Sequence, residues 1–383
     1  MRFTVNPYVF NEAVSFTVSM LYKPTQPILS GVLIEAISDK VTFTVFNYEV
    51  SAKMQITADV SKPGRVLVPG KLLANIAKKL SVREVEVSFD EYDSDNQVEI
   101  RNGSAVFKLP AMPVAEYPEI PTLDTVSGEV VGQDFVNAIL QVHAAASNDD
   151  VTPVLRGINF DIKDNIMTLS ATDRYRIAIT GINWQPLNGQ PDVSFLVPAK
   201  VVSDVSKQFS HAEKIQFVIK NEDDKQVIGF IGDNKIITTK LISGIFPPVH
   251  KYFENIPLDH YAVVNTDDLR RTIDIVSAVI DGDSAIKFTF QENKITLNGQ
   301  GGEASQATDE VFANLVGDEV TVGLTPKYLK DGLNGAKSEF IRISFFKSNT
   351  KRPGAILVTG QRSKDEHDEK SFKYLQQPIL LMR

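Results

Sequence analysis

The histidines and acidic side chains are the residues of this sequence that could do acid–base or metal chemistry. The only dense acidic run with a histidine, residues 364–370, is flanked by lysines, so we interpret it as a solvated loop. No nucleophile stands in a recognisable relation to a base. These patterns argue against an enzyme. The histidines are scattered without metal-ligand spacing, at His143, His211, His250, His260 and His367.

Composition limits the class of protein further. The 383 residues predict two or three domains, and 43% hydrophobic with 23% charged residues excludes a largely disordered chain. Cysteine is absent, so disulfides and cysteine-based zinc sites cannot form, and a reducing cytoplasm is the simplest setting. The sequence shows no signal-peptide pattern and no run of about 18 apolar residues. We therefore expect a soluble cytoplasmic protein.

A proline followed by a lysine closes an apolar strand and opens a helix three times along the chain. Proline suits this position because its fixed φ angle starts a helix and its missing N–H is not needed there. The prolines are 129 and 128 residues apart, so three units of that size account for the whole chain. The segments are Pro69-Gly70-Lys71, Pro198-Ala199-Lys200 and Pro326-Lys327.

Each unit also has an earlier amphipathic helix with one apolar face. In the first unit Asn6 caps the helix and Pro7 begins it, and in the third the helix begins at Thr266. The expected buried faces are Phe10, Val14, Val18 and Leu21 in the first unit, Phe135, Ile139, Val142 and Ala146 in the second, and Leu269, Ile273, Val276 and Ile280 in the third.

Alternating apolar and polar residues predict strands between these helices, for example at 41–45 and 85–89. Turns are expected at Asn102-Gly103 and at Asn298-Gly299, and the glycines that follow the second lack a phosphate-loop lysine. The fold class is therefore α+β, with three repeated units, each of two helices and about eight antiparallel strands. We expect domains at 1–122, 123–257 and 258–383. Prolines at the two boundaries act as stiff spacers, and an arc of similar units can close into a ring.

Several motifs along the whole chain resemble one family. Residues 171–178, Ala-Thr-Asp-Arg-Tyr-Arg-Ile-Ala, are similar to its most specific segment, and residues 107–110, 241–247 and 374–375 also match. With the threefold repeat, these motifs resemble the beta subunit of bacterial DNA polymerase III, the DNA sliding clamp. Residues 326–333 resemble its actinobacterial branch most closely.

The resemblance implies a DNA-clamp fold and a ring of two chains joined head to tail, which encircles duplex DNA regardless of its sequence. Such a ring tethers the replicative polymerase and confers processivity. Its partners would be the DNA polymerase III alpha subunit, the clamp loader and other proteins with a clamp-binding motif, with no membrane, cofactor or metal. A net charge of −8 fits this role, because a ring holds DNA by topology and strong neutralisation of phosphates would impede sliding.

Lysines of the second helices support contact with DNA. The segments 70–80, 198–210 and 326–337 together carry a net charge of +6 in a chain of −8. Acidic residues near the first helices, such as Asp149, Asp150 and Asp281, oppose it, and exposed lysines can also simply aid solubility. The expected DNA-facing residues are Lys23, Lys71, Lys78, Lys79, Lys200, Lys207, Lys327 and Lys330.

The family binds a short peptide with a glutamine and apolar anchors in a cleft between its second and third units. For the dimer interface the resemblance indicates Phe107 on the first unit and Val279 and Ile280 on the third. Apolar walls with a few polar groups suit such a peptide. The peptide pocket maps to Leu155, Thr172, Arg174, Tyr175, Arg176, Ile177, Pro247, Tyr252, Thr325, Tyr328, Ile356, Val358, Leu375, Gln377 and Pro378.

The C-terminal segment departs from the family pattern. Gln377 replaces an apolar pocket residue, and Leu380 stands where arginine is usual. An amide in an apolar pocket either hydrogen-bonds the ligand or weakens the site, so we expect an altered partner preference. Two alternatives to a main replicative clamp remain open at this point: a repeat-built binding scaffold without a DNA role, and a diverged clamp paralogue that serves fewer partners.

Overall fold

The computed structural model describes residues 1–81, 83–92, 95–120, 123, 125–188, 192–222, 225–254, 259–282, 284–302, 305–346, 354–363 and 372–380. The chain divides into two compact bodies. The first body comprises Met1–Gln133, Gln185–Gln190 and Asp204–Leu241, and the second comprises Asp134–Trp184, Pro191–Ser203 and Ile242–Arg383.

The order of elements repeats three times along the described chain, as the proline spacing predicts. The first repeat contains β1 to β9 with two helices, the second β10 to β18, and the third β19 to β26. Every strand pair is antiparallel. This confirms the α+β class and the two-helix unit. The helices are α1 (Pro7–Ser19), α2 (Gly70–Ala77), α3 (Gly132–His143), α4 (Ala199–Gln208), α5 (Thr266–Ser277) and α6 (Pro326–Ala336).

The helix starts follow from local chemistry. The Asn6 side chain accepts a hydrogen bond from the Tyr8 N–H at 2.9 Å, and Asn265 accepts from Asp267 and Asp268 at 3.0 and 3.1 Å. These caps satisfy N–H groups that the first helical turn leaves unpaired. Short 3-10 helices precede β2 and β11 or lie in loops: η1 (Pro27–Ser30), η2 (Val114–Glu116), η3 (Pro153–Arg156) and η4 (Val249–Phe253).

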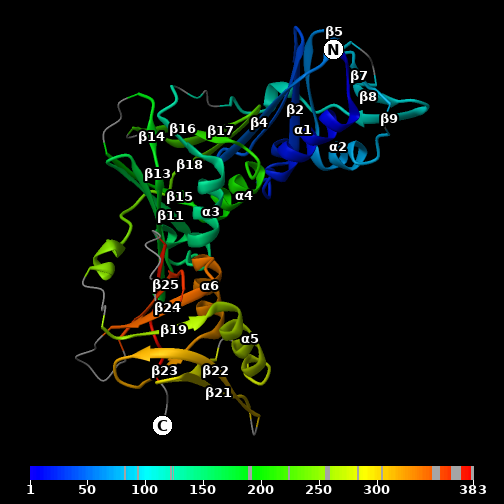
Figure 1. The fold of residues 1–383 in the computed structure, drawn as a ribbon. Coiled ribbons are helices and arrows are strands. Elements are labelled where there is room, and N and C mark those ends of the chain that lie inside the picture. Colours follow the sequence, from blue (N-terminus) through cyan, green and yellow to red (C-terminus); the bar gives the residue numbers. More distant parts are fainter. Residues whose placement is uncertain are drawn as a thin grey trace. The chain divides into compact units, whose positions relative to one another are not determined.

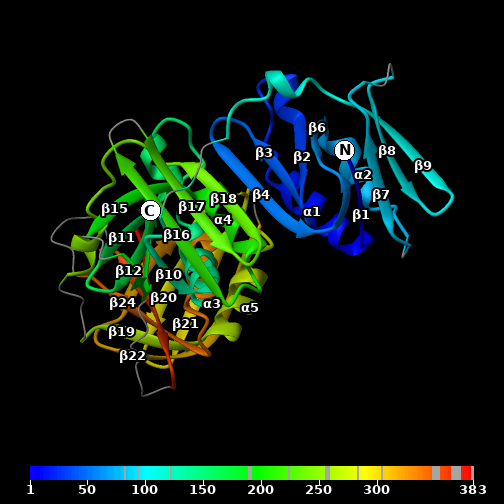
Figure 2. The same cartoon turned by 90° about the horizontal axis from the view of Figure 1, so that it is seen from above.

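Two sheets lie in the first body, and α1 packs against β3, β4 and α2 (Figures 1 and 2). The five-stranded sheet has the order β5 (Asp59–Lys62), β1 (Arg2–Val5), β7 (Val85–Phe89), β8 (Gln97–Asn102) and β9 (Ala105–Pro110). The nine-stranded sheet has the order β14 (Gln185–Pro186), β10 (Gly128–Val131), β16 (Lys214–Glu222), β17 (Lys225–Gly232), β18 (Lys235–Lys240), β4 (Val50–Thr57), β3 (Lys40–Phe46), β2 (Gly31–Ile37) and β6 (Gly64–Pro69).

The second body is built on a twelve-stranded sheet, with α5 packed on β21 and β22 and α6 packed on β25 and β26. Its strand order is β15 (Val193–Pro198), β11 (Gly157–Lys163), β12 (Ile166–Thr172), β13 (Arg176–Asn183), β26 (Lys373–Gln376), β25 (Ile356–Gln361), β24 (Phe340–Phe345), β19 (Tyr261–Asn265), β22 (Gln306–Val316), β21 (Lys294–Gln300), β20 (Ile286–Gln291) and β23 (Val320–Leu324).

Successive repeats are joined by strand pairing. In the first body β18 of the second repeat pairs with β4 of the first, and in the second body β13 of the second repeat pairs with β26 of the third. Because backbone hydrogen bonds run across both junctions, the repeats share continuous sheets. The spacer prolines are therefore not the only connection between repeats.

The Asn298-Gly299 turn was wrongly predicted. Both residues lie inside β21, whereas Asn102-Gly103 does form the turn between β8 and β9, with Gly103 at a φ of +65°. A Cβ atom on Gly299 would lie 2.8 Å from Cγ1 of Val276. Close packing of α5 on the strand, and not a chain reversal, therefore accounts for this glycine.

Candidate functional site

An open apolar pocket of about 1000 Å³ lies in the second body. Five segments far apart in sequence form it: the η3 region, the end of β12 with the start of β13, the η4 region, residues 346 and 354–355, and the end of β26 with the chain that follows it. Two of these segments, at β13 and at β26, belong to neighbouring strands. The β13–β26 ladder brings those two together, with Ile177 opposite Leu375. Ile177, Val249 and Leu375 form a buried cluster, against which Phe246 and Phe346 pack. These side chains give the pocket an apolar floor.

The turn between β12 and β13 is held by side-chain hydrogen bonds. The Asp173 carboxylate accepts from the Tyr175 and Arg176 N–H groups at 3.0 and 3.1 Å, and the Thr172 hydroxyl donates to the Arg176 carbonyl at 2.7 Å. Arg174, at the apex, has a φ of +80°, in the left-handed region. The turn thus fixes Tyr175 and Arg174 at the rim, where both side chains are exposed.

Arg176 anchors this turn to α6. Its side chain is buried and donates to Asp173 at 2.8 Å and to Asp331 at 2.5 Å, while the guanidinium lies 4.1 Å from the centre of the Tyr328 ring. The Tyr374 hydroxyl, also buried, donates to the Tyr328 carbonyl at 2.7 Å. Burial raises the pKa of Tyr374, so the phenol stays neutral beside these charges.

Most of the residues expected at the pocket lie around it. The lining includes Leu155, Thr172, Arg174, Tyr175, Arg176, Ile177, Pro247, Tyr252, Leu375, Gln377 and Pro378. Four expected residues do not line it. Ile356 and Val358 are fully buried in β25, and the carbonyls of Thr325 and Tyr328 accept hydrogen bonds from Gln376 and Tyr374. All four are linked to β26, two by strand pairing and two by these hydrogen bonds.

Eight further lining residues were missed from the sequence. Neither Val249 nor Ala355 belongs to a matched motif, so tertiary packing places them at the pocket. Ile379 had a local signal, since it follows the matched Pro378. The eight are Thr152, Val154, Val249, Phe346, Gly354, Ala355, Ile379 and Leu380.

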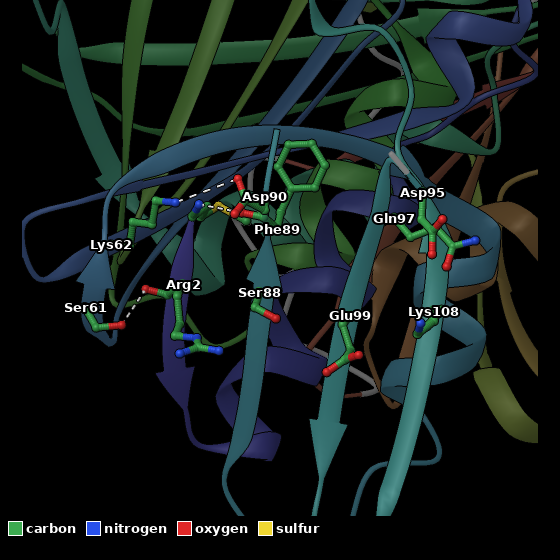
Figure 3. A pocket seen from close by; sticks show the side chains of 11 residues that line it. Arg2, Ser61, Lys62, Ser88, Phe89, Asp90, Asp95, Gln97, Glu99 and Lys108 are labelled. Atoms are coloured by element: carbon green, nitrogen blue, oxygen red, sulfur yellow. Dashed lines mark hydrogen bonds and ion pairs between the residues drawn. The ribbon is translucent and has the colours of Figure 1, made fainter. Parts of the chain in front are cut away.

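A second pocket, of about 570 Å³, lies on the five-stranded sheet of the first body (Figure 3). Its wall is made mostly of polar side chains from all five strands of this sheet, including Arg2, Ser88, Glu99 and Lys108. Lys62 of β5 lies 3.9 Å from Asp90. Charged groups of both signs leave little apolar surface for an anchor residue. This pocket therefore suits an apolar peptide far less than the pocket in the second body.

Neither metal chemistry nor a membrane span is indicated in the described ranges. Among those residues, no group of three or more histidine, aspartate and glutamate side chains could hold a metal ion. No helix there is long and apolar enough to cross a bilayer. The acidic run around His367 lies outside the described residues.

Family models match almost the whole chain. The N-terminal, central and C-terminal domains of the DNA polymerase III beta subunit match residues 1–121, 129–248 and 256–363. The chain belongs to the DNA polymerase III beta-subunit family. It is therefore a sliding clamp, a processivity factor of DNA replication and not an enzyme.

The curated relatives are sliding clamps and a clamp homolog. A beta sliding clamp homolog of Streptomyces muensis is 33% identical, and the beta sliding clamp of Streptomyces coelicolor is 32% identical, each over 100% of both chains. A Micrococcus luteus clamp is 34% identical over 82% of this chain. These relatives confirm the resemblance to the actinobacterial branch. The fold is similar to the Bacillus subtilis sliding clamp, with a TM-score of 0.88, 22% identity and complete coverage of both chains.

The lysines that the clamp family would turn toward DNA are mostly exposed. In the first body Lys23, Lys71, Lys78 and Lys79 are exposed, while Lys207 pairs with Asp204 at 2.9 Å. In the second body Lys200 and Lys327 are exposed, and Lys330 pairs with Asp274 at 2.9 Å. The two ion pairs reduce the cationic charge available to phosphates.

Two of the strand edges that stay open in the described parts of this clamp lie by the residues expected at the dimer interface. In the first body β9, which carries Phe107, pairs only with β8. In the second body residues 306–312 of β22 pair only with β21, because β19 pairs with residues 313–316. Val279 and Ile280 follow α5 beside this region, where a Cβ atom on Gly301 would meet the Val279 carbonyl. Phe107, Val279 and Ile280 are all partly buried.

Proposed function

We propose that two copies of this clamp join head to tail into a ring around duplex DNA. We further propose that the pocket in the second body binds a peptide segment of each partner: the DNA polymerase III alpha subunit, the clamp loader and other clamp-binding proteins. The apolar floor of the pocket would bind apolar side chains of the peptide, and the polar residues at its rim would contact polar groups of the peptide. Each chain contributes one such site, so a ring would carry two. The clamp role follows from membership of the family, and the pocket would tether the partner proteins to the clamp.

The apolar pocket is the observation that carries the peptide proposal. Its floor of Ile177, Val249 and Leu375 is ringed by polar groups from Thr172, Arg174 and Gln377. Its volume of about 1000 Å³ is at the upper end of the range for small-ligand pockets, so it can hold several residues of an extended chain. Apolar anchors in a groove with a few oriented polar groups are a usual mode of peptide recognition.

The open edges of β9 and of residues 306–312 support the head-to-tail ring. An exposed strand edge has N–H and C=O groups without a backbone partner, and pairing the edge with another chain would satisfy these groups. Head-to-tail pairing of two different edges generates a closed ring when the rotation closes. Phe107 on one edge and the segment with Val279 and Ile280 beside the other would supply the apolar contact.

The exposed lysines and the domain limits belong to the same proposal. With a net charge of −8, ionic attraction to the phosphates would stay weak enough to allow sliding. The lysines that would face the duplex are Lys23, Lys71, Lys78, Lys79, Lys200, Lys207, Lys327 and Lys330. The domains would span 1–122, 123–257 and 258–383, one for each repeat of elements. The reducing cytoplasm is where such a cysteine-free replication protein would work.

A diverged clamp with fewer partners is the second candidate, and the C-terminal segment favours it. Gln377 and Leu380 both line the pocket, at positions where the family pattern has an apolar residue and an arginine. Both side chains are exposed at the pocket. The sliding function would be the same, and the set of peptides would be narrower.

A peptide titration tests the pocket directly. We expect an acetylated, amidated peptide with glutamine, leucine and phenylalanine anchors to bind the full chain in fluorescence anisotropy. Tyr252→Ala should weaken binding about tenfold, because an aromatic side chain at a binding pocket contributes a large share of the affinity. Tyr92→Ala is the matched control, since Tyr92 is exposed in the first body and does not line this pocket. Absence of binding, or equal losses for both variants, would overturn the proposal.

A further inference from the structure

We propose that Arg174 is a specificity-determining residue that selects an acidic side chain within the bound partner peptide. The inference rests on the proposed peptide-binding function of the pocket and adds the charge of the ligand to it. It follows from the charges that line the pocket, from the contacts of Arg174 and from its backbone conformation.

Only two charged side chains line the pocket within the described residues, and both are arginines. Arg176 is buried and its charge is offset by Asp173 and Asp331. The Asp173 carboxylate also accepts the two backbone hydrogen bonds that hold the turn, so its oxygens already have partners there. This network of one arginine and two carboxylates offers no cation to a ligand, so Arg174 is the charged side chain of the pocket lining that could bind one.

The Arg174 guanidinium has a neutral partner. Its Nη2 donates to the Thr152 hydroxyl, and its backbone N–H donates to the Thr172 hydroxyl at 3.2 Å. No carboxylate lies within ion-pair distance of Arg174 in the described part of the chain. The nearby acids have other contacts, since Asp150 pairs with Arg156 and Asp149 accepts from the Val151 N–H at 3.0 Å. Most of the five donors of the guanidinium therefore stay available.

The backbone does not call for an arginine at this position. A φ of +80° favours glycine and is costly for a residue with a β-carbon. Glycine would therefore suit this backbone conformation better than arginine, so the turn itself does not explain the long cationic side chain. Thr152 lies across the rim on the loop before η3, so its hydrogen bond directs the guanidinium along the pocket mouth.

A carboxylate is the group that this geometry recognises. Arginine presents donors in a planar fork that matches a carboxylate, and such charge-assisted hydrogen bonds are stronger than neutral ones. The carboxylate belongs to an aspartate or glutamate within the peptide, because a pocket of this size is crossed by several residues and Arg174 stands at its rim. A terminal carboxylate would require the peptide to end at that rim.

Paired peptides test the inference with the full-length chain. Each peptide is acetylated and amidated, keeps the glutamine, leucine and phenylalanine anchors, and carries either Glu or Gln at one position between or beside them. We expect the Glu form to bind the wild type about five- to tenfold more tightly at one position, and the difference to shrink as salt is raised. In Arg174→Gln the two forms should bind equally, and Arg174→Lys should keep part of the preference.

Two further variants separate recognition from folding. Arg174→Gly removes the cation at a backbone position that favours glycine, so loss of the Glu preference there cannot come from a damaged turn. Lys251→Gln removes an exposed charge that does not line the pocket, and it should keep the preference. Equal binding of Glu and Gln peptides by the wild type, or a preference that survives Arg174→Gln, overturns the inference while leaving the peptide pocket intact. A preference seen only with a free terminal carboxylate also overturns it, and absence of any peptide binding removes the proposed function as well.

Discussion

Gln377 shows how one residue can change the affinity of a pocket. Its backbone N–H donates to the Tyr175 carbonyl at 2.8 Å, so the chain path does not depend on the side chain, which is exposed at the pocket. We predict that Gln377→Met binds a peptide with apolar anchors three- to tenfold more tightly, because the amide no longer has to be desolvated. Isothermal titration against the wild type measures the effect, with exposed Gln97→Met as control. Equal affinities would contradict the altered partner preference.

Tyr117 illustrates a residue whose role is stability. Its hydroxyl accepts from the Phe46 N–H at 2.7 Å, and burial raises its pKa from 10.0 to about 12. The folded state thus favours the neutral phenol, so this contribution is complete below pH 10 and is lost as pH rises from 10 through 12.

We predict that Tyr117→Phe lowers the unfolding free energy at pH 8 by about 1 kcal/mol, because the Phe46 N–H loses its acceptor. The variant should also lose less stability than the wild type between pH 10 and 12. Urea unfolding followed by circular dichroism checks both effects. Burial and a hydrogen bond to Asp204 also raise the pKa of Tyr22. The loss of unfolding free energy above pH 10 is therefore compared between the wild type and the variant. Parallel declines in both proteins would show that Tyr117 does not contribute.

The turn between β12 and β13 depends on one buried arginine that reaches α6. We predict that Arg176→Met destabilises the chain by about 3 kcal/mol, because Asp173 and Asp331 lose a buried partner. Arg156→Met is the matched control: it breaks the exposed pair with Asp150 and should cost less than about 1 kcal/mol. Thermal unfolding of both variants gives the comparison. Similar losses would mean that the Arg176 network adds no more than a surface ion pair.

The β9 strand is the element on which the proposed ring depends in the first body. We predict that Phe107→Lys converts the proposed dimer into monomers at micromolar concentration, because a charge replaces the apolar side chain that would contact the partner chain. Lys108→Gln, on the neighbouring residue of the same strand, should leave the dimer intact. Sedimentation velocity distinguishes the two species. An unchanged mass for Phe107→Lys would place the interface elsewhere.

At the scale of the whole molecule, the charge of the chain and its family role make one prediction about DNA. With a net charge of −8, retention on DNA should come from topology. We expect clamps loaded by the cognate clamp loader to stay on nicked circular DNA and to be lost when the circle is linearised. Equal retention on both would indicate ordinary DNA affinity, and no retention on either would contradict a sliding ring.

Local chemistry and spacing determined much of this protein from the sequence alone. The Asn6 and Asn265 caps, the prolines before the second helices and the alternation at residues 85–89 act within a few residues of one another, so they can be read from neighbours along the chain. The constant interval between the three Pro-Lys signals established the threefold repeat. The motif at residues 171–178 indicated the family and one wall of the pocket.

Only the tertiary structure decided which distant segments meet. A strand edge is the same run of N–H and C=O groups whatever its partner, so no local pattern could pair β18 with β4 or β13 with β26. For the same reason Val249 could not be placed beside Ile177, nor Asp331 beside Arg176. Gly299 gives the clearest case. Its neighbours suggest a turn, but the packing of Val276 against the strand requires the glycine there.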